Sequence, residues 1–306
     1  MSYRFEGNES VRKAVQRVAL EQLDIALEHT KAKAKLDEAV HDVRVCFKKL
    51  RGLIRLVRNE IGDKQYKREN ILYRNLNREL SEVRDVAALT EILDKLEMRF
   101  AGELADNAFA SFRKSLTSAT RRRQADKKAA LVQARKKIIA ARKRIKKWSI
   151  KNDDFGVVSS GLTRIYSRGR AGFDDSYAKQ TVRAFHEWRK DVKYLWYHLE
   201  LLRELWPKEL KRFAKQVEKL VDYLSDDHDL AMLRERVLEA SRESKGEHEA
   251  EALMALIDKR RAELQTEARF LGERIYAEKG DAFQNRFHEY WKTWRAEQQV
   301  NPIGAR

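Results

Sequence analysis

Apolar residues recur every three or four positions along most of the chain, which is the spacing of one face of an α-helix. Val43, Phe47, Leu50 and Ile54 form one such stripe. No alternation of apolar and polar residues lasts long enough to predict a strand. The pattern predicts an all-α protein, with helices near 9–35, 37–60, 64–80, 82–101, 104–148, 156–168, 175–205, 207–224, 227–243, 246–278 and 280–298.

Few residues in the chain can break a helix. The 306 residues include only 2 prolines and 12 glycines, fewer than an average protein contains. The best predicted linkers are 151–156 and 169–175. No apolar run approaches the ~18 residues of a membrane span, and the N-terminus has no apolar signal core. With the single cysteine, Cys46, these features predict a protein of the reducing cytoplasm.

An internal repeat divides the chain. His41-Asp42-Val43-Arg44, followed by Lys48, reappears 145 residues later as His186-Glu187-Trp188-Arg189, followed by Lys193. The segment LSEVRD at 80–85 reappears 144 residues later as LSDDHD at 224–229. Two motifs in the same order and nearly the same register indicate duplication. We therefore expect two homologous helical halves, 1–150 and 151–306, related by a pseudo-two-fold axis.

The chain carries a large positive charge. Lys and Arg number 65 against 48 acidic residues, a formal +17, and such an excess favours a polyanionic partner. Thirteen of the basic residues lie between 121 and 147, within the long basic helix predicted at 104–148. Two interpretations of this helix stay open: a solvated basic face, or an anion cleft lined by Lys128, Arg135 and Arg142.

The strongest clue is a row of basic side chains without interleaved acids. His41, Arg44, Lys48, Arg51 and Arg55 are spaced 3, 4, 3 and 4 residues apart, so they share one helical face beside the apolar stripe. Like charges one turn apart repel, and a bound polyanion converts that repulsion into attraction. Arg offers a planar fork for phosphate oxygens, and His donates and gains charge near an anion.

The second copy of the motif has a shorter row of basic residues. Each half also has a pair of arginines one helical turn apart, Arg74 and Arg78 in the first and Arg164 and Arg168 in the second. Trp196 and Glu200 stand where the first copy has Arg51 and Arg55, so the second half should contribute fewer cations. No P-loop or Rossmann glycine pattern is present. The predicted anion-contacting residues are His41, Arg44, Lys48, Arg51, Arg55, Arg74, Arg78, Arg164, Arg168, His186, Arg189, Lys190 and Lys193.

These motifs resemble the CHAD family, the conserved histidine α-helical domain. The likeness rests on His41-x-x-Arg44-x-x-x-Lys48, on its second copy from His186 to Lys193, on the two LS-x-x-(R/H)-D segments and on YSRGR at 166–170. It departs from many members at Tyr194 and Trp196, where they have basic residues. No Glu-x-Glu-x-Lys signature of an adjoining triphosphate tunnel domain occurs, so the chain resembles a stand-alone member.

The resemblance implies two four-helix-bundle-like halves around a basic central cavity that binds inorganic polyphosphate. It also implies association with polyphosphate granules and no catalytic activity, and we expect neither a cofactor nor a metal.

The residues also suggest other functions. Non-specific binding of RNA or DNA through the phosphate backbone is the main alternative, although few aromatic residues interleave the row for base stacking. A scaffold that recruits partners through the basic 121–147 segment is a weaker one. A metal-dependent phosphohydrolase, suggested by His41-Asp42 and His228-Asp229, is disfavoured because the basic row would repel a divalent ion.

Overall fold

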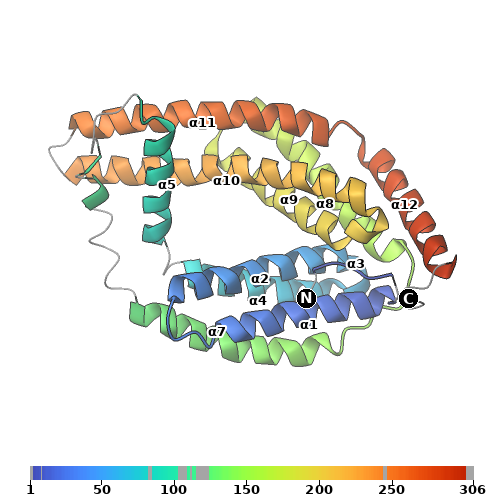
Figure 1. Ribbon diagram of the computed structural model, residues 1–306. Helices are drawn as coiled ribbons and strands as arrows, with labels where there is room; N and C mark the ends of the chain where they lie inside the picture. Colours follow the sequence, from blue (N-terminus) through green and yellow to red (C-terminus); the bar gives the residue numbers. More distant parts are fainter. Residues whose placement is uncertain are drawn as a thin grey trace.

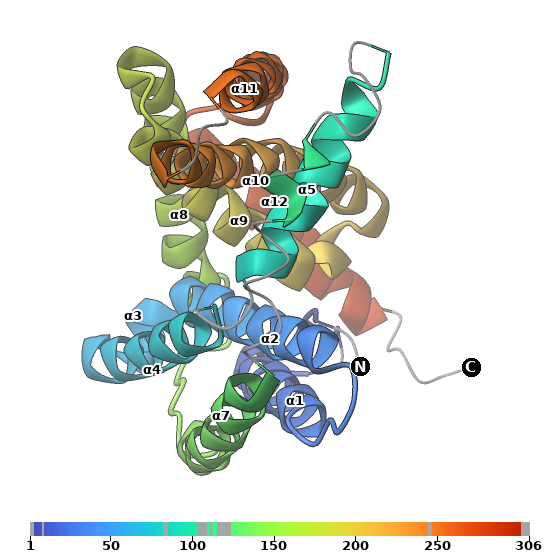
Figure 2. The same ribbon diagram turned by 90° about the vertical axis from the view of Figure 1, so that its left-hand side faces the viewer.

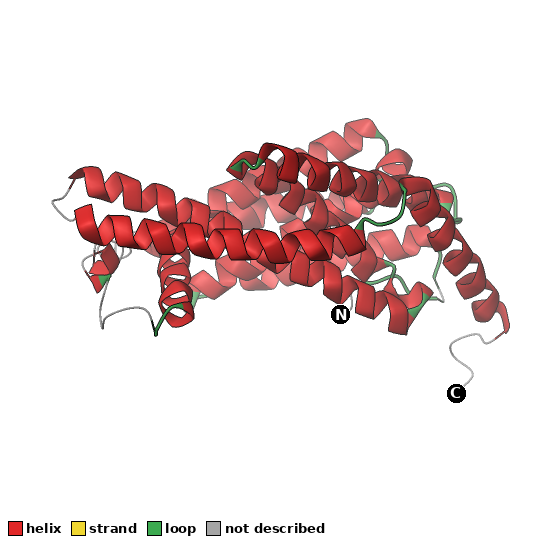
Figure 3. Cartoon of the chain, turned by 90° about the horizontal axis from the view of Figure 1, so that it is seen from above, coloured by secondary structure: helices red, strands yellow, loops and turns green. Residues whose placement is uncertain are grey.

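The computed structural model confirms the all-α prediction. It describes residues 3–7, 9–81, 85–102, 109–110, 112–114, 124–243 and 247–300, and within these ranges it contains helices and no strand (Figure 3). Two layers of helices lie one above the other (Figure 1). In the described ranges, no helix combines the length and the apolarity that crossing a bilayer requires.

The lower layer is a four-helix bundle from the first half. It contains α1 (Val11–His29), α2 (Leu36–Leu56), α4 (Asp63–Ser81) and α7 (Gln124–Ile145), with the short α3 (Arg58–Ile61) between α2 and α4. The Ser10 side chain caps α1 by accepting from the Lys13 N–H. On α2 the predicted apolar stripe is fully buried, including Val43, Phe47 and Leu50, so this face drives the helix into the bundle.

The upper layer comes from the second half. Its elements are α8 (Gly156–Lys179), α9 (Val182–Leu201), a 3-10 turn η2 (Arg203–Leu205), α10 (Pro207–Glu243), α11 (Glu247–Ile275) and α12 (Gly280–Val300). Here α9 packs on α8 and α10, α10 packs on α11, and α12 packs on α8. Aromatic residues fill this core, with the rings of Tyr166 and Phe283 stacked 3.8 Å apart. The main hydrophobic core fills this layer around α8, α9 and α12 and continues into the lower layer.

One helix of the first half packs on the second. α5 (Asp85–Arg99) stands against α10 and α11 (Figures 1 and 2). Its Leu93 and Leu96 join Leu230, Leu233 and the other members of a hydrophobic cluster separate from the main core. The first half therefore contributes to the upper layer as well as the lower one. The 150/151 boundary and the pseudo-two-fold relation stay predictions.

Two predicted breaks are wrong. The linker predicted at 169–175 lies inside α8, and the break near 225 lies inside α10. A Cβ on Gly169 would collide with the Tyr276 hydroxyl, and one on Gly172 would lie 3.2 Å from the Trp188 ring. These glycines therefore permit close helix packing rather than a turn, and the break between α8 and α9 falls at Gln180, which has a positive φ of 48°.

The long basic helix predicted at 104–148 lies partly outside the described residues. Positions 103–108, 111 and 115–123 are not described, and from Gln124 the chain is the helix α7, which ends at Ile145.

The two layers meet where α2 approaches α9 and α8. A Cβ on Gly52 of α2 would lie 2.9 Å from the Tyr197 Cβ of α9, and one on Gly161 of α8 would collide with the Leu56 carbonyl. The buried His198 ring nitrogen Nε2 lies 3.0 Å from the Gly52 carbonyl oxygen. Glycine at these two contacts lets the backbones approach closely, and this closeness sets the geometry of the basic residues beside them.

Candidate functional site

The crossing of α2 and α9 brings the two copies of the basic motif together. We call His41, Arg44, Lys48, Arg51 and Arg55 the α2 cation row, and His186, Arg189, Lys190 and Lys193 the α9 cation group. Burial and then the charge of Arg189 lower the pKa of Lys193 to about 8, and Arg44 across the interface acts in the same direction. Arg44 of the first half and Lys193 of the second are therefore close enough to interact electrostatically.

Arg51 and Arg55 form the densest part of the α2 cation row. Arg51 Nε donates to the Asn70 side-chain oxygen at 3.2 Å, and Arg55 donates to the same oxygen at 2.9 Å. The Arg55 guanidinium also lies 4.0 Å from the centroid of the Tyr194 ring on α9. Burial lowers the pKa of Arg51, with further contributions from Arg55 and Arg74. Two partly buried guanidiniums are thus held by a neutral amide and an aromatic ring.

Arg51 and Arg55 are not neutralised by an ion pair within the described residues, although the charge of Arg55 acts on the buried carboxyl group of Asp191. Among the described residues, no carboxylate oxygen lies within 4.0 Å of either guanidinium. A buried cation is normally paired with an acid, because removing it from water is costly. The pair therefore leaves positive charge available to an anion at the boundary between the halves.

The other predicted arginine pairs lie around this centre. Arg74 and Arg78 are exposed on α4, and Arg74 is close enough to Arg51 to affect its pKa. On α8, Arg164 donates to the Asn59 side-chain oxygen at 2.9 Å, which links α8 to the short α3. Arg168 differs, because it forms an ion pair of 3.1 Å with the buried Asp191. Arg168 therefore has at least one acidic partner, Asp191.

The α9 cation group is more deeply set. Arg189 Nε donates to the Ser225 hydroxyl of α10 at 2.9 Å. Burial lowers the pKa of Arg189, and the neighbouring Asp229 opposes that shift. Burial also raises the pKa of Asp229 itself. Lys190 is different, since it forms a surface ion pair of 2.6 Å with Glu187, and such exposed pairs contribute little to stability.

The predicted histidines occupy different environments. His41 is exposed near the start of α2, whereas His186 is partly buried on α9. The His186 ring lies 4.4 Å, centroid to centroid, from the ring of His228 on α10. Burial is the largest cause that lowers the pKa of both histidines, to about 4 for His228. At neutral pH these rings are therefore uncharged.

The basic helix α7 is mostly engaged with its own bundle. Lys127, Lys137, Arg142 and Arg144 form ion pairs with acids of α1, α2 and α4, and the closest, from Arg144 to the buried Glu69, spans 2.6 Å. The remaining exposed cations of α7 are Lys128, Lys136 and Lys143, and Lys146 and Lys147 follow its end. The structure thus favours a solvated basic face over an anion cleft, since Arg142 already pairs with Asp24 at 2.7 Å.

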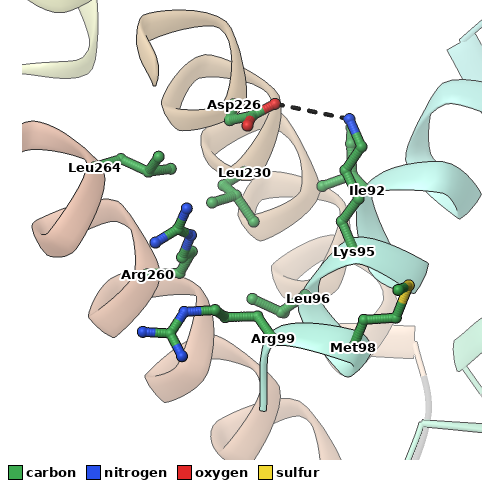
Figure 4. A pocket seen from close by; sticks show the side chains of 9 residues that line it. All are labelled: Ile92, Lys95, Leu96, Met98, Arg99, Asp226, Leu230, Arg260 and Leu264. Atoms are coloured by element: carbon green, nitrogen blue, oxygen red, sulfur yellow. Dashed lines mark ion pairs between the residues drawn. The ribbon is translucent and has the colours of Figure 1, made fainter. Parts of the chain in front are cut away.

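A pocket of about 380 Å³ lies elsewhere, between α5, α10 and α11 (Figure 4). Its apolar wall includes Leu96, Leu230 and Leu264. Two arginines at one end, Arg99 and Arg260, both donate to Glu263. At the other end Lys95 lies 3.8 Å from Asp226, as the dashed line in Figure 4 marks. Its cations are therefore compensated, unlike Arg51 and Arg55.

Several residues of this site escaped sequence reasoning. Asn70 and Asp191 hold predicted cations, yet nothing in their spacing distinguishes them. Ser225 and His228 belong to the repeated LS-x-x-(R/H)-D segment, so the repeat was a signal that they lie near the α9 cation group. The Arg55 guanidinium lies over the Tyr194 ring. The position of Tyr194 within the second copy of the motif was the sequence feature that could have pointed to it.

Comparison with known proteins identifies the family of the chain. No curated protein matches the chain significantly. The family model of the CHAD domain matches residues 17–238, more than half of the 306-residue chain. That range includes both copies of the basic motif and the helices that carry them. CHAD domains are linked to polyphosphate-related proteins. The chain therefore belongs to the CHAD family.

Proposed function

We propose that this protein binds inorganic polyphosphate between its halves without catalysing a reaction. The α2 cation row would contact the chain from one side, and the α9 cation group from the other. Arg74, Arg78, Arg164 and Arg168 would extend the contacts along α4 and α8. A string of phosphates suits a linear series of separate donors.

One observation carries the proposal. Arg51 and Arg55 are partly buried side by side, and their shared hydrogen-bond acceptor is the uncharged Asn70. Their repulsion and their desolvation both cost free energy. An anion at this position would offset both costs, so the site is better suited to a charged ligand than to water alone.

The aromatic residues at the site favour polyphosphate over single-stranded nucleic acid. The Tyr194 ring is covered by Arg55, and the Tyr66 ring has the Arg58 guanidinium 4.6 Å from its centroid. Bases bind such proteins by stacking on open aromatic rings. Rings that already carry guanidiniums are poor stacking platforms. Nucleic-acid binding is therefore an outcome that the experiment below must distinguish.

The test is a double charge reversal across the interface. Arg44→Glu with Lys193→Glu should weaken binding of long polyphosphate by about 100-fold at low salt, since each lost phosphate contact costs binding free energy. Titration calorimetry measures the affinity, and circular dichroism checks the helical content. The matched control reverses two exposed lysines of α7, Lys136→Glu with Lys143→Glu, which should leave affinity within a few-fold of wild type.

Three outcomes decide the proposal. If both double variants lose affinity equally, the positive charge acts diffusely and no specific site exists. If single-stranded RNA displaces polyphosphate at equal phosphate concentration, the protein is a nucleic-acid binder. If incubation with polyphosphate releases orthophosphate, the binding-only role is wrong. Association with polyphosphate granules in the cytoplasm follows from the proposed binding, and fluorescence microscopy of the tagged protein with and without polyphosphate tests it.

A further inference from the structure

Two imidazole rings from different helices meet beside the α9 cation group. His186 of α9 and His228 of α10 have ring centroids 4.4 Å apart and an interplanar angle of 45°. The Nδ1 atoms of both rings are buried, and neither has a hydrogen-bond partner in the described part of the chain. Buried polar atoms in folded proteins almost always have partners. An unpartnered, buried Nδ1 favours the tautomer that carries its N–H on Nε2, so each neutral ring has Nε2–H as the donor that a ligand can use.

The surroundings of the pair are mostly basic. Arg189 and Lys190 of α9 disfavour protonation of His186, and Glu187 opposes them weakly. Arg189 and Arg261 of α11 act in the same way on His228. Of the nearby acids, Asp227 pairs with Arg261 at 3.0 Å, and burial raises the pKa of Asp229, which disfavours its charged form. A metal cation is therefore disfavoured here, and an anion is favoured.

The sequence repeat adds an asymmetry between the halves. In the LS-x-x-(R/H)-D segment of the first copy, the residue at this position is Arg84, whereas the second copy has His228. An arginine is charged at every accessible pH, whereas a histidine changes its charge between pH 5 and 8. The second half thus has a titratable group where the first half has a permanent cation.

We propose that His228 is a further anion-contacting residue, and that the His186–His228 pair makes polyanion binding tighten as the pH falls. This inference rests on the proposed function. At neutral pH each neutral ring donates a hydrogen bond from its one N–H group to a phosphate oxygen. As the pH falls, a proton from solvent adds to the second ring nitrogen, and the imidazolium gains an ionic contact with the bound anion.

The sign follows from linkage between proton and ligand binding. In the free protein, burial and the neighbouring arginines keep both rings neutral. A bound polyanion stabilises the imidazolium form and raises its pKa, so the complex binds more protons than the free protein does. Affinity therefore rises with falling pH between the pKa of the complex and the lower pKa of the free protein. Each fully coupled proton gives at most about a tenfold rise per pH unit.

The experiment measures affinity against pH for the full chain. The ligands are long polyphosphate and dextran sulfate, whose sulfate esters keep their charge across the range. For wild type, affinity should rise about tenfold from pH 7.5 to pH 5.5. In His228→Gln the rise should fall to about threefold or less, and His186→Gln should behave similarly. In His228→Arg affinity at pH 7.5 should approach the wild-type value at pH 5.5, and the remaining rise with falling pH should be no larger than in His228→Gln.

The control is His288→Gln. His288 lies in α12, outside this site, and its ring stacks on Phe155. This variant should keep the full wild-type rise. If wild type binds neither ligand at any pH, the proposed function fails and this inference fails with it. If wild type binds but His228→Gln and His228→Arg keep the wild-type pH dependence with native helicity, the inference alone is wrong. Dextran sulfate separates titration of the protein from titration of the phosphate chain ends.

Discussion

The guanidinium of Arg55 on α2 lies 4.0 Å from the centroid of the Tyr194 ring on α9. A cation from one half of the chain therefore rests on an aromatic ring from the other. Such contacts contribute about 0.5–2 kcal/mol depending on desolvation, but they do not cancel the positive charge. The contact orients Arg55 at the interface while its charge stays available to an anion.

Asn70→Asp should weaken polyphosphate binding. The substitution keeps the shape of the side chain and places a carboxylate against Arg51 and Arg55, whose charges it would neutralise. We expect about a tenfold loss of affinity at low salt and a shallower dependence of affinity on salt concentration, because fewer counterions are released. The free energy of unfolding should not fall. Titration calorimetry over a salt series measures the binding change.

The matched control is Asn285→Asp, the same change at an exposed position of α12, outside the site. Its affinity should stay within about threefold of wild type, because long-range effects of a single surface charge are screened by salt. Equal losses in the two variants would contradict a specific role for the Arg51–Arg55 pair.

Polyphosphate binding should weaken at alkaline pH through Lys193. Burial and Arg189 lower the pKa of this lysine to about 8. In the free protein Lys193 therefore loses its positive charge as the pH rises through that value. A bound anion favours the charged form, and affinity therefore falls above pH 8, by about tenfold between pH 7.5 and pH 9.5. Lys193→Arg keeps its charge and should remove most of this decline. An equally steep decline in Lys193→Arg would exclude Lys193 as its source.

Gly161→Ala should destabilise the fold. The new Cβ would collide with the Leu56 carbonyl at the contact between α8 and the end of α2. Overpacking against backbone is difficult to relieve, and we expect the free energy of unfolding to drop by about 3 kcal/mol. Urea denaturation measures the change. The control is Gly102→Ala, where nothing lies within 4 Å of the added Cβ, and a loss of similar size there would contradict the packing argument.

Glu69→Gln should cost far more stability than Glu79→Gln. Glu69 is buried and accepts two hydrogen bonds from Arg144, at 2.6 and 3.0 Å. Its loss leaves a partly buried guanidinium without its acid, at a cost of about 3 kcal/mol. Glu79 pairs with Lys137 at 2.9 Å near the surface, and its loss should cost under about 1 kcal/mol. Chemical denaturation of both variants should reveal the difference, and similar losses would refute it.

Cys46 should be nearly unreactive in the native protein. Burial raises the pKa of its thiol to about 12, and the thiolate is the nucleophile. At pH 8 alkylation by iodoacetamide should be at least about 100-fold slower than in guanidinium chloride, where the side chain is exposed. Mass spectrometry of timed samples gives both rates. Rapid labelling of the native chain would show that this part of the first bundle opens readily.

Much of the helical structure follows from local pattern in the sequence. The helical period predicted the all-α class, and the α2 stripe of Val43, Phe47 and Leu50 is buried as expected. Periodicity works because burying one face is the main force that places an amphipathic helix. The repeat of the basic motif predicts two related halves, and α2 and α9, the helices that carry its two copies, are in contact.

The errors arose where one residue type serves two purposes. Glycine at 169 and 172 predicts a turn, yet both glycines lie inside α8, where neighbouring aromatic rings approach them. Spacing along the chain cannot distinguish a glycine required by backbone dihedrals from one required by a close neighbour. Only the positions of Tyr276 and Trp188, about 100 and 20 residues away along the chain, decide between the two.

The sequence by itself determined which faces are apolar, which rows are basic and that the motif occurs twice, because these properties depend only on residue type and helical period. The tertiary structure decided which cations are neutralised. Arg142 and Arg144 of the most basic helix meet Asp24 and Glu69, whereas Arg51 and Arg55 meet an amide and a ring. Ion pairing depends on distances of a few ångströms between side chains far apart in the chain, and no pattern along one helix contains them.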